Sequence, residues 1–68
     1  MKINTMSEKD EALYKASLYN EADVLFAEAK ENYELGFLEI AEDYENRFRQ
    51  ILDQLIYLGW DKEYMGIA

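Results

Sequence analysis

Apolar residues recur every three or four positions along most of the chain after position 20. This spacing is that of one face of an α-helix. The stripe consists of Leu25, Ala29, Tyr33, Phe37, Ile40, Tyr44, Phe48, Ile51, Leu55 and Leu58. From Phe37 onward, a variant of the stripe that passes through Ala41 steps by four and three residues alternately, as in a coiled-coil seam. The pattern predicts an all-α fold with a long amphipathic helix over 20–58.

Two related phrases lie within this stripe. FAEAKENYE, at 26–34, and FLEIAEDYE, at 37–45, share five of nine positions and start eleven residues apart. An eleven-residue period is about 3.67 residues per turn, close to the pitch of an α-helix. On one continuous helix the phrases stack in register, with two tiers of glutamates opposite the apolar stripe. The tiers consist of Glu28, Glu31 and Glu34, and of Glu39, Glu42 and Glu45.

Gly36 separates the two phrases and is the weak point of the predicted long helix. A glycine inside a helix costs roughly 1 kcal/mol relative to alanine. Two interpretations follow. Gly36 either lies within a continuous helix, where it allows a neighbouring helix to come close, or it ends the helix and turns the chain back as a hairpin. The unbroken register favours the continuous helix, and the hairpin stays open as the alternative.

Helix start signals divide the N-terminal part of the chain. Thr5-Met-Ser-Glu8 fits a capping box, with Ser7 as a competing cap, so we expect a flexible arm over 1–5 and a first helix over 6–19. Asn20 is a good N-cap and predicts a break before the long helix.

The C-terminal end of the long helix is marked by Gly59, which suits a left-handed cap. The tail that follows, over 59–68, is rich in apolar residues. These are Trp60, Tyr64, Met65 and Ile67. A tail of this composition is expected to dock on the helices.

The length of 68 residues fits a single small domain. A chain of this size buries only about 60% of its unfolded surface, so its own core is marginal. Cysteine and histidine are both absent, which leaves neither a disulfide nor the commonest metal ligand to reinforce it. We therefore expect a homodimer that associates through the apolar stripe.

The net charge of −8 is confined to one part of the chain. Residues 20–45 hold nine acids and one base, Lys30, whereas charges on either side cancel. Such a surface repels nucleic acids and anionic membranes, and we expect neither as a direct ligand. The six glutamates of the two tiers are the candidate binding face for another protein with a basic surface. The alternative is that these glutamates form a solvent-exposed helix face that only keeps the protein soluble.

The residue types in this chain do not favour catalysis or metal binding. Without cysteine or histidine there is no nucleophile–base pair, and no glycine-rich phosphate loop occurs. The carboxylates also lack the Glu-x-x-His pairs of di-iron bundles and the spacing of a calcium loop. We expect no enzymatic activity, no cofactor and no metal.

Six tyrosines are many for so short a chain. Tyrosine and tryptophan are enriched at binding hot spots, which makes Tyr57, Trp60 and Tyr64 candidate anchors. The alternative is packing at the edge of the core with the hydroxyls in water.

Two functions remain. The first is a regulator or inhibitor that binds a protein partner, for example by presenting carboxylates to a basic groove that binds nucleic acid. The second is a structural module that only joins copies of itself. In size, acidity and tyrosine content the chain resembles the small helical inhibitors that phages use against host proteins, a likeness of composition that involves no motif. No apolar run suggests a signal peptide or a membrane span, so we expect a cytoplasmic protein, in the host cell if a phage encodes it.

Overall fold

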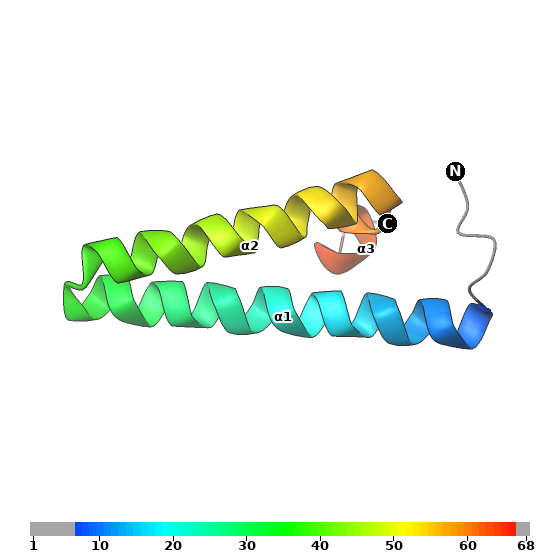
Figure 1. The fold of residues 1–68 in the computed structure, drawn as a ribbon, viewed down its shortest axis with the longest axis horizontal. Coiled ribbons are helices and arrows are strands. Elements are labelled where there is room, and N and C mark those ends of the chain that lie inside the picture. Colours follow the sequence, from blue (N-terminus) through cyan, green and yellow to red (C-terminus); the bar gives the residue numbers. More distant parts are fainter. Residues whose placement is uncertain (1–6, 67–68) are drawn as a thin grey trace.

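The computed structural model describes residues 7–66, and all regular structure in this range is helical. Helix α1 spans Glu8–Leu35, α2 spans Leu38–Leu58 and α3 spans Asp61–Tyr64. Helices α1 and α2 lie side by side and run in opposite directions (Figure 1). The short α3 lies beside their open end. The chain is therefore a helical hairpin with a third, single-turn helix.

The N-cap of helix α1 is Ser7, whose hydroxyl accepts a hydrogen bond from the Asp10 amide at 3.2 Å. Ser7 has extended backbone angles, as an N-cap requires. Thr5, the N-cap of the predicted capping box, and the predicted arm over 1–5 lie outside the described residues. The observed cap is the competing one, Ser7, so α1 starts at Glu8 and not at residue 6. The cap at Ser7 thus fixes the first turn of α1.

The predicted break at Asn20 is wrong, because α1 continues through it as one helix of 28 residues. Leu18 and Ala22, on either side of Asn20, are both buried in the hairpin. An N-cap contributes about 1 kcal/mol. Ending the helix there would disrupt apolar packing on both sides, so the cap preference of Asn20 is outweighed.

The continuous helix over 20–58 is also wrong, and the alternative, a hairpin turning at Gly36, is the observed structure. Gly36 has a φ of +85°, in the left-handed region that glycine adopts without strain. Its amide donates to the Tyr33 carbonyl at 3.1 Å, and the Phe37 amide donates to the Asn32 carbonyl at 2.9 Å. These two bonds form a Schellman cap that ends α1 and reverses the chain.

A second cap of the same kind ends α2 at Gly59, as its position in the sequence predicts. Gly59 has a φ of +79° and its amide donates to Ile56 at 3.1 Å. The Trp60 amide donates to the Leu55 carbonyl at 2.8 Å. This turn directs the tail back toward α1.

Small residues bring the two long helices together. The buried side chains are Leu18, Ala22 and Ala29 on α1 and Ala41 and Leu55 on α2. The three alanines permit close approach of the backbones, and Leu55 is the largest side chain that is fully buried. The core of the described residues is therefore a narrow seam between α1 and α2.

The apolar stripe that was expected to join two copies is largely used within the hairpin. Ala29 and Leu55 are buried, whereas Tyr33, Phe37 and Ile40 are at least 42% exposed. The half-buried members are Leu25, Tyr44, Phe48, Ile51 and Leu58. Folding back at Gly36 places the two halves of the stripe against each other, so a dimer cannot use the stripe as one continuous surface.

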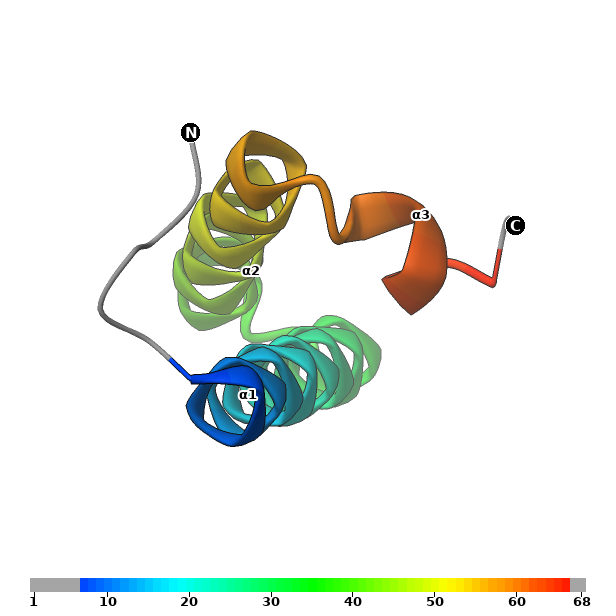
Figure 2. The same ribbon diagram turned by 90° about the vertical axis from the view of Figure 1, so that its right-hand side faces the viewer.

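The tail docks beside α1, as its apolar composition predicts (Figure 2). The Tyr19 hydroxyl donates to the Trp60 carbonyl at 3.2 Å, and the Tyr64 hydroxyl donates to the Asp23 carboxylate at 2.7 Å. Burial, together with this bond to Asp23, raises the pKa of Tyr64 to about 12. Lys15 adds an ion pair with Glu63 at 2.9 Å. Ile67, also expected in the docked tail, lies outside the described residues.

Candidate functional site

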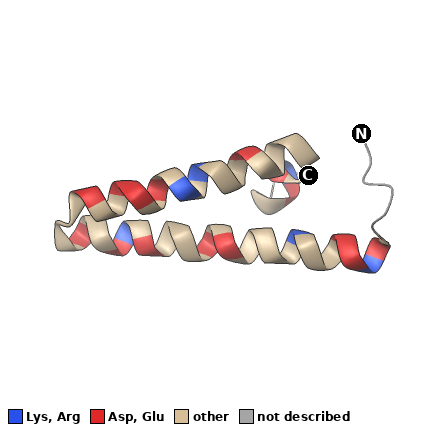
Figure 3. Ribbon diagram, viewed as in Figure 1, with Lys and Arg blue, Asp and Glu red and all other residues tan. Residues whose placement is uncertain are grey.

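The acidic residues gather at the turn end of the hairpin, which we call the turn half and define as residues 28–45. It holds seven acids and one lysine, a net charge of −6. Both glutamate tiers belong to it, one on α1 and one on α2 (Figure 3). The tiers were predicted to stack on a single helix. They lie instead on two antiparallel helices because the chain reverses between them.

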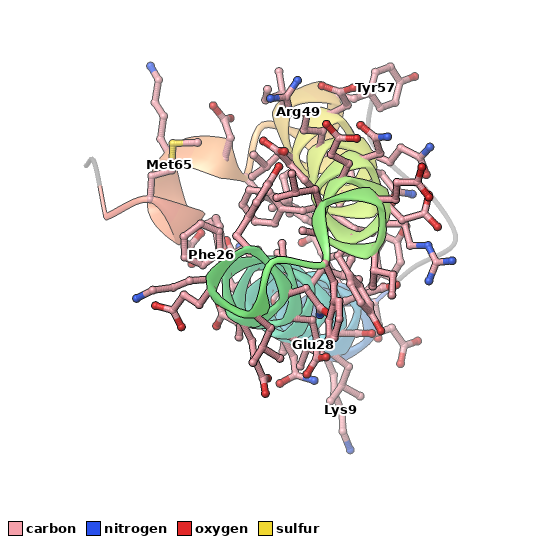
Figure 4. The ribbon with its side chains drawn as sticks, turned by 90° about the vertical axis from the view of Figure 1, so that its left-hand side faces the viewer. Lys9, Phe26, Glu28, Arg49, Tyr57 and Met65 are labelled. Atoms are coloured by element: carbon pink, nitrogen blue, oxygen red, sulfur yellow. The ribbon has the colours of Figure 1, made fainter. Side chains whose placement is uncertain are left out.

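Most of the tier residues point away from the seam between the helices. Glu31 follows the buried Ala29 by two residues, which is about 200° around α1. Glu39 precedes the buried Ala41 by the same interval on α2. Figure 4, viewed from the turn end, shows Glu28 on the side of α1 away from α2. The single carboxylate face expected from the sequence is therefore divided into two outer faces.

Glu45 differs from the other tier residues because it bridges the two helices. Its carboxylate accepts from the Tyr33 hydroxyl at 2.6 Å and from the Arg49 guanidinium at 3.0 Å. The bond from Tyr33, and secondarily the one from Arg49, lowers the pKa of Glu45. The same bond raises the pKa of Tyr33. Glu45 is thus held by contacts within the hairpin.

Large apolar side chains are exposed beside these acids. Leu35, Phe37, Leu38 and Ile40 surround the turn, and each is at least 50% exposed. Clustered exposure of this kind marks interaction sites on soluble proteins. The turn half therefore combines negative charge with an apolar tip.

An open groove follows the seam on the side of the hairpin where α3 lies. It consists of two hollows of about 490 and 530 Å³ that share Phe26 and Phe48. The two rings pack at a centroid distance of 5.4 Å. The surface of the first hollow is mostly apolar, and its charged residues are Lys30, Glu34, Glu45 and Arg49. The groove is thus a concave surface to which all three helices contribute.

The three aromatic anchors suggested by the sequence differ in their surroundings. Tyr57 is 86% exposed and projects outward from α2 (Figure 4). Trp60 and Tyr64 are half-buried and hold the tail. Trp60 meets the Tyr14 ring edge-to-face at 6.0 Å, and Tyr64 packs on Tyr19 at 5.2 Å. Tyr57 is the candidate that remains free.

The sequence reasoning missed Phe26, because it lies beside the stripe and was not assigned to it. A signal was present in the spacing. Tyr19, Phe26 and Tyr33 are seven residues apart, which places them on one face of α1. This row borders the groove.

Within residues 7–66, no group of three or more acidic side chains is arranged to hold a metal ion. None of the described helices has the length and apolarity required to cross a bilayer. Comparison with known protein families, with curated protein sequences and with solved structures found no match.

Proposed function

We propose that the protein is a non-catalytic binding protein that regulates or inhibits a cytoplasmic protein partner with a basic surface. The turn half is the proposed binding surface. The observation that carries this proposal is the net charge of −6 within eighteen consecutive residues, next to an exposed apolar tip. Lys30 is the one cation in this segment, whereas a surface helix that is only solvated commonly mixes both signs.

The two parts of this surface have different tasks in binding. The carboxylates of Glu28, Glu31, Glu39 and Glu42 attract a basic partner over a distance and orient it. The apolar side chains at the turn, such as Leu35 and Leu38, then supply contact area that excludes water. A groove that normally binds nucleic-acid phosphates is one partner surface of suitable charge, which would make the protein an inhibitor of that binding.

A second function, a structural module that joins copies of the chain, is favoured by a different feature. The apolar groove lies on another side of the hairpin from the outer glutamates. Self-association there leaves both acidic faces accessible. The two functions are therefore compatible, and they predict different effects of substitution.

The experiment compares two variants with the same change in charge. Glu31→Lys/Glu42→Lys reverses one exposed carboxylate on each helix of the turn half. The control, Glu21→Lys/Asp53→Lys, reverses one exposed carboxylate on each helix outside it. Immobilised wild-type, variant and control chains are used to capture proteins from a cell lysate at low and at physiological salt.

We expect wild type and control to retain a common basic protein and the turn-half variant to lose it. Salt should weaken the capture, since exposed charges are screened within about 10 Å at 0.1 M. Double-stranded DNA, added as a competitor, should displace the partner if its basic surface is a nucleic-acid groove. Equal capture by the two charge variants would show that the turn half is only a solvated surface.

A further inference from the structure

The segment that follows Trp60 is attached to the hairpin in a different way from the two long helices. It contains α3, a helix of four residues, none of which is buried. A single helical turn is not stable alone, because helix nucleation is unfavourable. The place of α3 beside α1 therefore depends on the side chains that join it to the hairpin. We call residues 61–66 the strap.

Two residues of the strap contact α1. The Glu63 carboxylate accepts from the Lys15 ammonium at 2.9 Å, and the Tyr64 hydroxyl donates to the Asp23 carboxylate at 2.7 Å. The Tyr64 ring also packs on the Tyr19 ring, with centroids 5.2 Å apart. Lys15, Tyr19 and Asp23 are four residues apart and form one row along α1. The strap is thus joined to α1 through the side chains of a single row.

Water reaches these anchoring contacts. The side chain of Glu63 is 62% exposed and that of Lys15 is 25% exposed. Ion pairs at such positions contribute little to stability, and salt screens them. Asp23 is exposed and Tyr64 is half-buried, so water can replace the phenol at the Asp23 carboxylate. The contacts that hold the strap can therefore break one by one at small cost.

The strap does not fill the space between itself and the hairpin. An open hollow of about 530 Å³ lies there. Its lining residues are Tyr19, Asp23 and Phe26 on α1, Phe48 on α2, and Glu63 and Tyr64 in the strap. The buried residues of the seam all belong to the long helices. Separation of the strap from α1 therefore leaves the seam intact.

Trp60 marks the point at which the firmly attached part of the chain ends. Its amide donates to the Leu55 carbonyl at 2.8 Å, and its carbonyl accepts from the Tyr19 hydroxyl at 3.2 Å. Its ring meets the Tyr14 ring edge-to-face at a centroid distance of 6.0 Å. Trp60 is thus held to both long helices. Rotation of the chain after Trp60 can move the strap without breaking the cap at Gly59.

We propose that the strap is a hinged lid on the groove, which separates from α1 as a unit by pivoting at Trp60 while the hairpin stays folded. In the closed state, Glu63 and Tyr64 form the outer wall of the hollow beside α3. In the open state this wall is removed, so the groove is accessible from Tyr19 onward. Figure 2 shows the strap beside the hairpin, joined to it only after the end of α2. The lid is independent of what binds the turn half.

The first test is hydrogen exchange of single amides in the full chain, followed by nuclear magnetic resonance. The amides of Tyr64, Met65 and Gly66 donate within residues 60–66 and report on the strap. We expect them to exchange more slowly than in an unfolded chain but at least about 100-fold faster than amides of α1 and α2 along the seam. Low concentrations of urea should accelerate the seam amides and leave the strap amides unchanged, because a local opening exposes little surface.

The second test compares matched substitutions of two tyrosines. Tyr64→Ala removes both contacts of Tyr64 with α1 and should bring strap exchange to the rate of an unfolded chain. Tyr64→Phe keeps the ring and should accelerate strap exchange about fivefold, because it loses the bond to Asp23. The controls are Tyr57→Ala and Tyr57→Phe, at a side chain that is 86% exposed. They should leave the strap amides unchanged, and all four variants should keep slow exchange along the seam.

The third test measures access to the hollow with a soluble, neutral nitroxide, which broadens the resonances of groups that it can approach. Tyr19 and Phe48 are half-buried and line the hollow. Their ring resonances should broaden more in Tyr64→Ala than in Tyr57→Ala, because release of the strap opens the hollow. The ring of Trp60, at the pivot, should broaden equally in both variants.

Four results would overturn the proposal. Strap and seam amides with the same exchange rate and urea dependence would show that the strap separates only when the whole chain unfolds. Unprotected strap amides in the wild type would show that the strap is never closed. Equal effects of Tyr64→Ala and Tyr57→Ala on strap exchange would show that Tyr64 does not hold it. Equal broadening of Tyr19 and Phe48 in these two variants would show that the strap does not limit access to the groove.

Discussion

Replacement of Leu55 by alanine would remove the largest side chain that the hairpin buries completely. Leu→Ala substitutions at buried sites cost about 2–5 kcal/mol, from lost burial plus the cavity that remains. Leu55 lies in the seam near the open end of the hairpin, where α1 and the tail limit collapse around the cavity. We expect a loss of about 3 kcal/mol. A chain of 68 residues has a total stability of about 3–10 kcal/mol, so Leu55→Ala should lose at least about a third of it.

The assay is urea unfolding followed by far-ultraviolet circular dichroism and by the fluorescence of Trp60, the only tryptophan. Both probes should move to a lower urea midpoint together, because the Trp60 amide is bonded to the Leu55 carbonyl. The matched control is Leu13→Ala, which deletes the same atoms from a side chain that is 61% exposed. The control should change the free energy of unfolding by less than about 0.5 kcal/mol.

The reasoning would be refuted if Leu55→Ala and Leu13→Ala shifted the midpoint equally. That result would mean that the seam between α1 and α2 does not hold the fold. Each comparison is made at one protein concentration, because any association of folded chains adds a concentration-dependent term to the measured stability.

Three further predictions concern the caps and the titrating groups. Gly36→Ala should destabilise the hairpin by about 1–2 kcal/mol in urea unfolding, because an alanine at a φ of +85° is strained although its Cβ would meet no atom within 4 Å. Gly36→Asn should cost less. The lowered pKa of Glu45 stabilises the fold above the ordinary value of 4.5, and this contribution is lost as the pH falls below that value. The urea midpoint should therefore fall on acidification, and less steeply in Glu45→Gln. The raised pKa of Tyr64 has the opposite sign, so stability should be lost between pH 10 and about 12, with a change in Trp60 emission that Tyr64→Phe reduces.

The features that the sequence predicted well are those fixed by local chemistry. Gly59 ends α2 as expected, because a glycine after an apolar helix face can adopt the left-handed cap without strain. Helical periodicity likewise predicted an all-α fold and found most residues of the seam. The tail was predicted to dock from its apolar residues alone, and Trp60 and Tyr64 make the contacts.

The reversal at Gly36 could not be decided from periodicity. A stripe that continues across a two-residue turn has the same spacing whether its halves extend one helix or face each other on two. The structure resolves this through the two bonds of the cap at Gly36, which reverse the chain direction. The predicted single acidic face required one continuous helix. Because the chain reverses at Gly36, the two glutamate tiers lie on different helices.

The periodicity of the sequence also could not predict which distant residues contact each other. Glu45 and Glu34 occupy equivalent places in the two phrases, yet only Glu45 accepts the Tyr33 hydroxyl. The groove is lined by residues of different helices, and which of them meet depends on where the chain turns. The sequence therefore supplied the residues of the candidate surfaces, whereas the fold determined which of them act together.

The chain reversal at Gly36 is the central claim, because both proposed surfaces depend on it. It is tested by the distance between spin labels on cysteines placed at the exposed positions Asn20 and Asp53. Labelled chains are unfolded and refolded with a large excess of unlabelled chains, so that only distances within one chain are measured. The hairpin predicts about 20–25 Å, the width of two adjacent helices with their side chains. A distance of about 50 Å, the length of 33 residues in one continuous helix, would contradict it.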